Sequence, residues 1–484
     1  MNDTRPLILW FRRDLRLDDH PMLHAAALTG RALVPVFIAD ETVLTLGAAA
    51  RWRMGEGVAA FSRRLTGQGS RLILRRGKAL DTLMALVAEV GAGGLWWSRL
   101  YDPASRTRDA KIKETLRKQG IEARSFHGHT LAEPWDVQTG AGAAFKVYTP
   151  FFKALDSRGV PPPMPAPQRL IAPPVWPGSD DLAGWRLGAA MNRGAPVLAR
   201  HAQVGEGAAL ARLDRFLVTA VETYRTDRDF PAKPAVSGLS ENLSLGEIGP
   251  RRLWHSACAI ESADPGHPGA LHFRKELAWR DFAHHLMFHT PHILTDNWRP
   301  EWDSFPWLHD GPQAERWRRG MTGERLVDAG LRQMYVTGSM HNRARMMVAS
   351  YLCKHLMIHW KTGMNWFADC LTDWDPASNA MGWQWVAGSG PDAAPYFRVF
   401  NPATQAEKFD SAGVYRRNFI AEGQSRPPAD ALAYFDAVPR AWGLHAGQPY
   451  PAPLVDLAEG RARALAAYGA RIRTEGTSKS ELQP

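Results

Sequence analysis

Tryptophan, arginine and asparagine side chains crowd one stretch of this chain, from Glu276 to Asp410. Ten of the nineteen tryptophans lie between Trp279 and Trp385, and segments such as WRDF (279–282) and HNRARM (341–346) place cations beside them. A nucleic acid suits this mixture, because its phosphates attract cations and its bases stack on aromatic rings. Each tryptophan alone is more often a core residue. Together they indicate a nucleic-acid-binding region.

The HNRARM segment opens a long helical pattern. Asn342 and Met346 are four residues apart and share one helix face, while His341 and Arg345 share the neighbouring face. An amide and a thioether on one face suit the polar edge and the apolar ring of a base. From spacing alone, core packing with a capping amide is the more frequent alternative.

Two further polar segments carry weaker signals. The loop from Tyr224 to Ser240 offers hydroxyls and backbone N–H groups that suit phosphates. DWDPASN, at 373–379, places two carboxylates two residues apart. A metal or an acid–base pair is one interpretation, but no His/Cys ligand set accompanies them. We expect no metal, and we interpret this segment as a loop that binds hydroxyls or cations.

Composition narrows the class of protein. The 484 residues carry a formal net charge of +10, which favours a polyanionic partner, although a solvated basic surface is the alternative. Three distant cysteines form no disulfide framework, which fits a reducing compartment. We find no signal-peptide pattern and no apolar run long enough for a bilayer. We expect a cytoplasmic protein without a membrane partner.

Strand and helix patterns alternate over residues 1–130 and predict an α/β domain with a Rossmann-like parallel sheet covered on both faces. The first strand leads into FRRDLRLDDH, without the glycine fingerprint of dinucleotide-binding folds. The expected strands are 7–11, 34–38, 72–74, 94–97 and 123–126; the expected helices are 22–28, 51–65, 80–90 and 105–118.

The rest of the chain changes character twice. Residues 131–199 are expected to be an interdomain linker, because eight prolines fall between Pro161 and Pro177 and favour extended conformations. Residues 200–470 are expected to be all-helical, including one helix over 339–360. The last residues, 471–484, are expected to be a polar tail that is disordered from Thr474 on.

Three segments together resemble the cryptochrome/photolyase family, and within it the bacterial photolyases of cyclobutane pyrimidine dimers. They are LILWFRRDLRLDDHPMLHAA (7–26), GEGAALARLDRFL (205–217) and WQWVAGSGPDAAPYFRVFNPATQAEKFD (383–410). The resemblance implies an all-helical C-terminal domain that binds FAD in a U shape. It also implies light-driven repair of UV-damaged DNA, by electron transfer from photoexcited reduced FAD to a flipped pyrimidine dimer.

The resemblance assigns roles to residues of this sequence. The FAD phosphate loop corresponds to Tyr224, Val236, Ser237, Gly238, Leu239 and Ser240. The FAD ribose and ring are implied to contact Phe273, Arg345, Asp373, Asp375 and Asn379. Two positions depart from the family pattern, since Val236 stands where Thr is usual and Phe273 where Trp is common.

The same resemblance implies a lesion pocket and an electron relay. The catalytic residues are Glu276, Asn342, Met346 and Asn379, with Trp279 and Trp385 as aromatic walls. The DNA surface is completed by Arg228, Arg280, Arg343, Arg398, Gln405 and Lys408. Trp383, Trp360 and Trp307 correspond to a relay that carries electrons from the surface to the flavin, with three core tryptophans as the alternative.

Several alternatives stay open. A cryptochrome-type light receptor would share the fold, FAD and the relay, and a photolyase of (6-4) photoproducts would differ at Asn342 and Met346. A second, light-harvesting chromophore is expected. LYDPASRTRD (100–109) lacks the Asn-Glu pair that grips folate in many relatives, so a folate such as methenyltetrahydrofolate, a deazaflavin or no antenna remain, with folate favoured. A monomer is expected.

Overall fold

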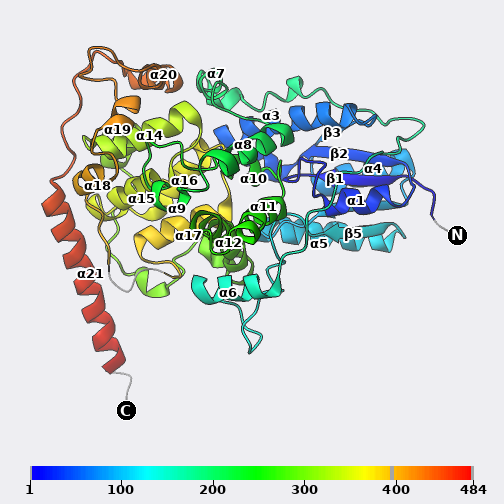
Figure 1. The fold of residues 1–484 in the computed structure, drawn as a ribbon, viewed down its shortest axis with the longest axis horizontal. Helices are drawn as coiled ribbons and strands as arrows, with labels where there is room; N and C mark the ends of the chain where they lie inside the picture. Colours follow the sequence, from blue (N-terminus) through cyan, green and yellow to red (C-terminus); the bar gives the residue numbers. More distant parts are fainter. Residues whose placement is uncertain (1–2, 393–396, 481–484) are drawn as a thin grey trace.

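A computed structural model describes residues 3–392 and 397–480 of the chain (Figure 1). The N-terminal part contains a five-stranded parallel sheet with strand order β3-β2-β1-β4-β5. The strands are β1 (Leu7–Phe11), β2 (Leu33–Ala39), β3 (Ile73–Arg76), β4 (Gly94–Ser98) and β5 (Glu122–Phe126). The predicted α/β fold and its five strands are confirmed.

The strands read as continuous apolar runs because helices cover both faces of the sheet. Leu7, Leu9 and Phe11 of β1 pack in one core cluster with Phe61, whereas Ile8 and Trp10 belong to a cluster on the other face. The covering helices are α1 (Pro21–Ala27), α3 (Ala48–Thr66), α4 (Ala79–Val90) and α5 (Pro103–Lys118). A short helix, α2 (Glu41–Leu44), follows β2 and was not predicted from the sequence.

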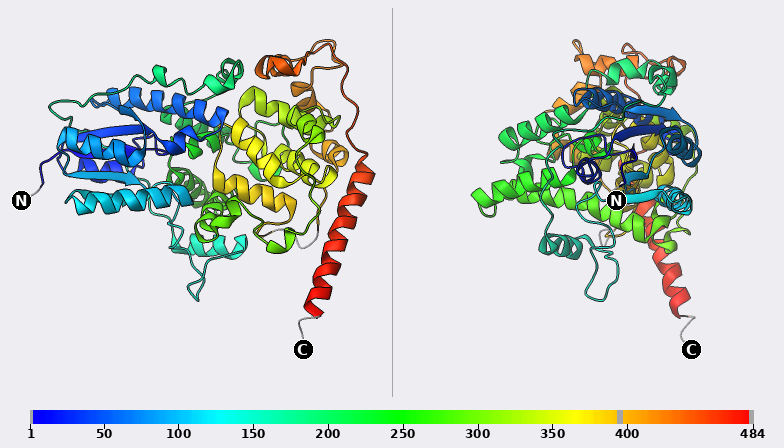
Figure 2. Two further views of the ribbon diagram at one scale, coloured as in Figure 1. Left: turned by 180° about the vertical axis from the view of Figure 1, so that it is seen from behind. Right: turned by 90° about the vertical axis from the view of Figure 1, so that its right-hand side faces the viewer.

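The linker is more structured than its prolines suggest. Residues 161–177 have no regular secondary structure, as expected, and Leu33 of β2 donates to the Ile171 carbonyl at 2.8 Å, which ties the linker to the sheet. The linker also holds α6 (Tyr148–Arg158), η1 (Ala183–Trp185), η2 (Ala189–Met191) and α7 (Gly194–Leu198). In Figure 2 it passes over both parts of the molecule.

Beyond β5 the described residues are helical or irregular, with one isolated bridge between Leu308 and Ile358. The larger helices are α8 (Glu206–Thr219), α11 (Pro250–Ala263), α12 (Pro268–His289), α14 (Arg325–Thr337), α17 (Pro376–Ala387) and α20 (Ala429–Ala437). The shorter ones are α9 (Tyr224–Asp227), α10 (Ser240–Ser244), α13 (Pro312–Arg318), α18 (Pro402–Phe409), α19 (Val414–Phe419), η3 (Pro291–Leu294), η4 (Pro300–Trp302) and η6 (Arg440–Trp442). In the described part of the chain, no helix is both long and apolar enough to cross a bilayer.

The prediction of a single helix over 339–360 is wrong. Helix α15 (Asn342–Ser350) runs into a π-helix, η5 (Tyr351–His355), and a new helix, α16 (Trp360–Cys370), follows. Met357 between them has φ +58°, a left-handed conformation that ends a helix. The apolar spacing continues through this break, which is why periodicity alone did not show it. The break makes Trp360 the first residue of α16.

The expectation that the C-terminal tail is disordered is also wrong for most of its length. Helix α21 (Leu457–Ser480) extends through it and leaves the body of the molecule in Figures 1 and 2. Tyr468 anchors the helix by stacking on Phe397, with ring centroids 4.6 Å apart, and by approaching Trp302 at 6.0 Å. Residues 481–484, like residues 393–396 within the 383–410 segment, lie outside the described residues.

Candidate active site

The predicted phosphate loop, Val236–Ser240, lies between α9 and α10. Gly238 has φ +65°, a backbone conformation that side chains disfavour. Arg212 of α8 donates from Nη1 to the Gly238 carbonyl at 2.5 Å. Arg212 therefore places a cation beside the loop, which suits an anionic ligand. Sequence reasoning missed this arginine, because it lies in a separate amphipathic helix.

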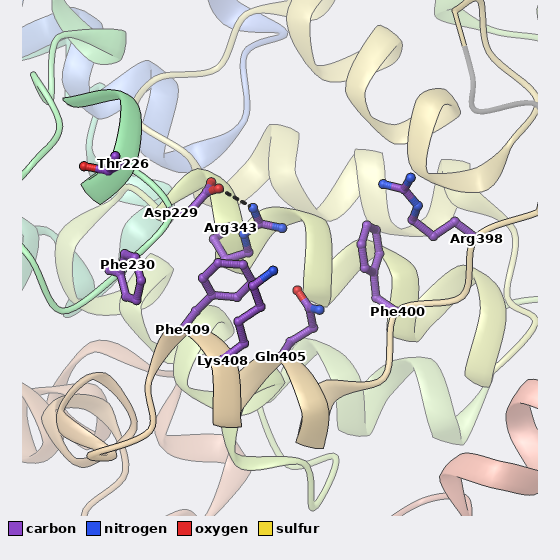
Figure 3. Close-up of a pocket in the computed structure, with 9 residues that line it drawn as sticks. All are labelled: Thr226, Asp229, Phe230, Arg343, Arg398, Phe400, Gln405, Lys408 and Phe409. Carbon is purple, nitrogen blue, oxygen red and sulfur yellow. Dashed lines mark ion pairs between the residues drawn. The ribbon is translucent and has the colours of Figure 1, made fainter. Parts of the chain in front are cut away.

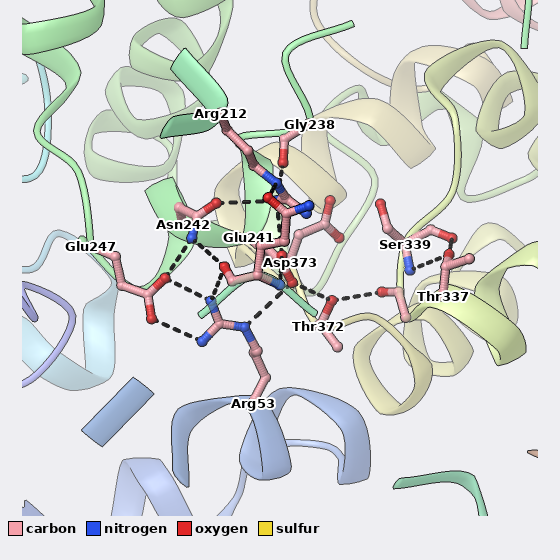
Figure 4. Close-up of polar contacts among 12 residues, drawn as sticks. Arg53, Arg212, Gly238, Glu241, Asn242, Glu247, Thr337, Ser339, Thr372 and Asp373 are labelled. Atoms are coloured by element: carbon pink, nitrogen blue, oxygen red, sulfur yellow. Dashed lines mark hydrogen bonds and ion pairs between the residues drawn. The ribbon is translucent and has the colours of Figure 1, made fainter. Parts of the chain in front are cut away.

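Glu241 joins the phosphate loop to two other parts of the molecule (Figure 4). Its carboxylate accepts from Arg212 Nη1 at 2.9 Å, from Arg53 Nε at 3.3 Å and from Thr372 Oγ1 at 3.3 Å. Arg53 comes from α3 of the α/β domain and also pairs with Glu247 at 2.6 Å. Removing one partner from such a buried network leaves an uncompensated charge, so the network fixes the loop against the sheet domain.

Helix α15 and the loop before α17 meet at an ion pair. Arg345 Nη2 donates to Asp373 Oδ2 at 2.6 Å, and Asp373 Oδ1 is buried with no hydrogen-bond partner among the described residues. Asp375 caps α17 by accepting from the Ser378 amide at 2.7 Å, and Asn379 Nδ2 donates to the Asp375 carbonyl at 2.9 Å. The unpaired carboxylate oxygen suits a hydroxyl donor, so these residues fit the sugar-like chain and ribose of FAD.

Asp375 also belongs to a buried cluster at the domain junction. Its Oδ2 lies 3.2 Å from His284 Nε2, and the His284 and His129 rings are 5.0 Å apart and perpendicular. Burial would raise the pKa of Asp375, but His284 and Arg280 hold it well below its usual value. Arg280 Nη2 lies 3.0 Å from His129 Nε2, and this adjacent cation disfavours a metal ion between the imidazoles and the carboxylate.

Glu276 lies on α12, and its side chain is half-buried. Its carboxylate forms an ion pair with Arg228, and His272 Nε2 lies 3.5 Å away on the preceding turn. Burial opposes the charge of Arg228, but Glu276 raises the pKa of that guanidinium above its usual value. Trp279 follows one turn later on the same helix. Arg228, predicted to contact DNA, is thus paired with the predicted catalytic carboxylate.

Asn342 and Met346 lie on one face of α15, exposed and half-buried respectively, as their spacing predicts. His341 caps the helix, because its Nδ1 accepts from the Arg343 amide at 3.1 Å. Trp385, the second predicted wall, donates from Nε1 to the Asp392 carbonyl at 3.1 Å. Its indole is therefore held by the residue that immediately precedes the undescribed segment 393–396.

A basic groove opens beside these residues (Figure 3). Arg343 stacks over Phe409 at 4.2 Å and pairs with Asp229 at 2.7 Å, and Lys408 lies 5.2 Å from the same phenyl ring. The groove is lined by Thr226, Asp229, Phe230, Arg343, Arg398, Phe400, Gln405, Lys408 and Phe409. Four of the predicted DNA contacts thus come together, with phenyl rings between cations.

Arg280 does not join that groove. Its guanidinium donates to the His129 carbonyl at 2.6 Å, at the junction between the linker and α12. A DNA contact by Arg280 stays a prediction, and it requires this pairing to open. The sequence showed only that an arginine follows Trp279. It could not show whether Arg280 points toward the groove or toward His129, because adjacent helical residues point to different sides.

The three tryptophans of the predicted relay lie at different depths: Trp383 and Trp360 are buried, and Trp307 is half-buried. Trp383 of α17 packs against Gly363 of α16, where a Cβ atom would meet its ring. Trp360 is fully buried and donates from Nε1 to Asn297 Oδ1 at 2.8 Å. His359 lies between Trp360 and the half-buried Trp307, with ring centroids 5.4 Å from each. Burial lowers the pKa of His359 to about 4, which keeps this bridging ring neutral.

Comparison with known proteins agrees with this architecture. Family models described as DNA photolyase and as FAD binding domain of DNA photolyase match residues 7–168 and 273–470. The deoxyribodipyrimidine photo-lyase of Agrobacterium fabrum is 44% identical, over 97% of this chain and 99% of that protein. The crystal structure of a bacterial class III photolyase from Agrobacterium tumefaciens matches with TM-score 0.89 and 43% identity, over 97% of this chain and 98% of that one. Cryptochrome-1 of Arabidopsis thaliana is 31% identical, over 98% of this chain and 72% of that protein.

A parallel α/β domain joined through a long linker to a helical FAD-binding domain defines a photolyase-like flavoprotein. The chain belongs to the DNA photolyase family, and the resemblance read from its sequence is confirmed.

Proposed function

We propose that this protein repairs cyclobutane pyrimidine dimers in DNA by light-driven electron transfer from reduced FAD. One observation carries the proposal: a single helix, α15, serves three sites. Arg343 lines the basic groove, Asn342 and Met346 are the predicted lesion contacts, and Arg345 pairs with Asp373 of the predicted flavin site. DNA, lesion and cofactor contacts that alternate along one helix suit a reaction in which an electron crosses a short gap.

The chain's own residues bind the damaged strand and orient and stabilise the extruded dimer. Arg343, Arg398 and Lys408 attract the phosphates of the damaged strand. The dimer is extruded into the pocket between Trp279 and Trp385; photolyases are among the base-flipping enzymes, and flipping costs roughly a few kcal/mol, least for damaged bases. Stacking on the two indoles offsets that cost.

FAD, when bound, supplies the light absorption and the electron that opens the cyclobutane ring and then returns. Arg212 and the 236–240 loop would hold its phosphates, Asp373 its hydroxyls, and Asn379 would present a neutral amide to the ring. Glu276 would hydrogen-bond the dimer and support protonation of its radical anion. Trp383, Trp360 and Trp307 would carry electrons from the surface to reduce the oxidised flavin.

The alternative is a cryptochrome-type receptor, favoured by the similarity to Cryptochrome-1 of Arabidopsis thaliana. One experiment separates the two functions. Reduced protein is mixed with DNA that carries cyclobutane thymine dimers, illuminated, and the remaining dimers are counted. Light-dependent loss of dimers supports repair. Flavin photochemistry without any loss of dimers would reject the proposal.

We also propose a folate antenna, such as methenyltetrahydrofolate, in the cavity between the two domains. Helices α3, α14 and α16 line this cavity, and its lining includes the aromatic side chains Tyr335, Trp366 and Trp442. The Tyr335 and Trp442 rings are perpendicular, with centroids 5.6 Å apart. Aromatic walls at a domain boundary suit a flat heterocycle, and α16 leads directly into the Asp373 loop, which keeps an antenna near the flavin.

Chromophore extraction tests the antenna. Denatured protein should release FAD and a folate, and Trp442→Leu should lose the folate while it retains FAD. A deazaflavin spectrum or FAD alone would reject the folate, and a folate retained in Trp442→Leu would reject its location. We propose further that the protein acts in the cytoplasm on chromosomal DNA and that it is a monomer. Light scattering of the purified protein tests the monomeric state.

A further inference from the structure

A linker residue contacts one wall of the lesion pocket. Tyr148, the first residue of α6, stacks face to face on Trp279 of α12, with ring centroids 3.6 Å apart and an interplanar angle of 7°. Its hydroxyl donates to the Lys275 carbonyl at 2.6 Å, one turn before Trp279. Tyr148 is only 8% exposed, so the protein encloses most of the ring.

The surrounding rings fix this stack. Phe152, one turn along α6, lies 6.1 Å from Tyr148 at 25°, and Phe282 meets both Tyr148 and Trp279 edge-on at 6.0 and 5.8 Å. Tyr148 therefore covers one face of the indole and Phe282 its edge. A flat base can stack only on the opposite face of Trp279.

The phenol stays uncharged in this position. Burial raises the pKa of Tyr148, and the carboxylates of Glu276 and Asp392 raise it further. A neutral ring adds no charge beside Glu276, so its contribution to the pocket is shape. No motif in the sequence pointed to Tyr148, which lies far upstream of the predicted lesion residues.

We propose that Tyr148 is a positioning residue that sets the orientation of Trp279 and, through it, the preference for an extruded dimer over undamaged DNA. This inference rests on the proposed repair function and deepens it. A stacked indole is preorganised, whereas an unsupported one must be ordered when the dimer enters, at a cost in affinity. Contacts with phosphates in the groove are independent of Tyr148, so binding of undamaged DNA should not change.

The test measures dark binding to two duplexes, one with a single thymine dimer and one identical but undamaged, at fixed salt. Tyr148→Leu should lower the ratio of the two affinities about tenfold, within the range of one base-stacking contact. Tyr148→Phe keeps the ring and should stay within about twofold of the wild type. Thr149→Ala, at an exposed position beside Tyr148 on the same helix, is the matched control and should leave the ratio unchanged.

Trp279→Leu and the double variant complete a cycle that isolates the coupling between the two residues. Once Trp279 is absent, Tyr148→Leu should have no further effect on the ratio. At saturating damaged DNA, the yield of repair per absorbed photon should be unchanged in Tyr148→Leu, while the DNA concentration for half-maximal repair rises. Flavin content and photoreduction serve as checks of folding.

An unchanged affinity ratio in folded Tyr148→Leu overturns the proposal, as does additive loss in the double variant. Equal loss of affinity for both duplexes also overturns it, since that result marks a general packing role. If Tyr148→Leu does not fold, Tyr148→Met, with a similar apolar volume, carries the same expectations. A wild-type protein without preference for the dimer would instead refute the proposed function itself.

Discussion

Arg345 on α15 and Asp373 before α17 form a 2.6 Å ion pair, and the second carboxylate oxygen of Asp373 is buried without a partner among the described residues. Replacing Arg345 with Leu leaves that carboxylate uncompensated. We expect a loss of roughly 3 kcal/mol in the free energy of unfolding, the scale of a broken buried pair, and protein purified with little flavin. Urea unfolding and flavin absorbance measure the two effects.

Arg343→Leu is the matched control, two residues away on the same helix. Its partner Asp229 is 41% exposed, so the ion pair is solvent-screened and its loss should cost little stability. This variant should retain flavin and bind DNA more weakly. Full flavin occupancy in Arg345→Leu would contradict the role assigned to the Arg345–Asp373 pair.

The sequence predicted those parts of the fold and site whose residues are close in the chain. Strand runs, helix spacing and the Asn342–Met346 face all depend on local periodicity, and the structure has them where expected. Arg212 and Tyr148 were missed because they reach the site from α8 and from the linker. Nothing in a local pattern reports which distant side chain will pack against a given ring or loop.

Two local expectations failed for a related reason. The break at Met357 and the extension of α21 both oppose what propensity favours, because tertiary contacts decide them. Ile358 pairs with Leu308 just beyond the break, and Arg471, the first residue of the expected tail, lies 4.5 Å from the centre of the Trp302 ring. Arg280 illustrates the same limit within the site, since its neighbour Trp279 is a predicted lesion wall while its own guanidinium contacts His129.

Glu276→Gln should separate repair from cofactor binding. The amide keeps the shape of the side chain but removes the charge that pairs with Arg228 and the capacity to support protonation of the dimer anion. We expect the repair yield per photon to fall roughly tenfold, less than the full effect of a positioned acid–base group, because the amide can still hydrogen-bond the dimer. Flavin content should be unchanged. Dimer counting under calibrated light measures the yield.

Glu261→Gln serves as the control for Glu276→Gln. Glu261 of α11 also pairs with an arginine, Arg274 of α12, which lies two residues before Glu276 and therefore points to another side of that helix. It should repair like the wild type. Equal loss of flavin and of repair in Glu276→Gln would show that Glu276 supports the fold and not the reaction.

Trp360→Phe should block photoreduction of oxidised flavin and spare repair by flavin that is already reduced. Phenylalanine fills most of the cavity but is far harder to oxidise than indole, and the bond to Asn297 is lost. Flavin absorbance during illumination with an external reductant follows photoreduction. Trp254→Phe, a buried tryptophan in another core cluster, should photoreduce normally. Photoreduction at the wild-type rate in Trp360→Phe would exclude Trp360 from the relay.

His341 predicts how stability depends on pH. Burial lowers its pKa from 6.5 to about 4, with Arg228 and Arg343 adding to the effect and Asp229 opposing it. The unfolded chain therefore binds more protons than the folded one between these values, so the free energy of unfolding falls as pH falls through this window. The difference between these two pKa values sets an upper bound of roughly 3 kcal/mol on this contribution.

The structure gives that shift a mechanism and a control. His341 Nδ1 accepts from the Arg343 amide at the start of α15, and a protonated imidazole has no acceptor to offer. His341→Asn supplies a cap that does not titrate. Its stability at pH 7 should lie within about 1 kcal/mol of the wild type, and it should lose less stability than the wild type between pH 7 and pH 4, by up to roughly 3 kcal/mol. Urea unfolding at several pH values provides the comparison, and parallel curves for the two proteins would show that the cap of α15 does not respond to acid.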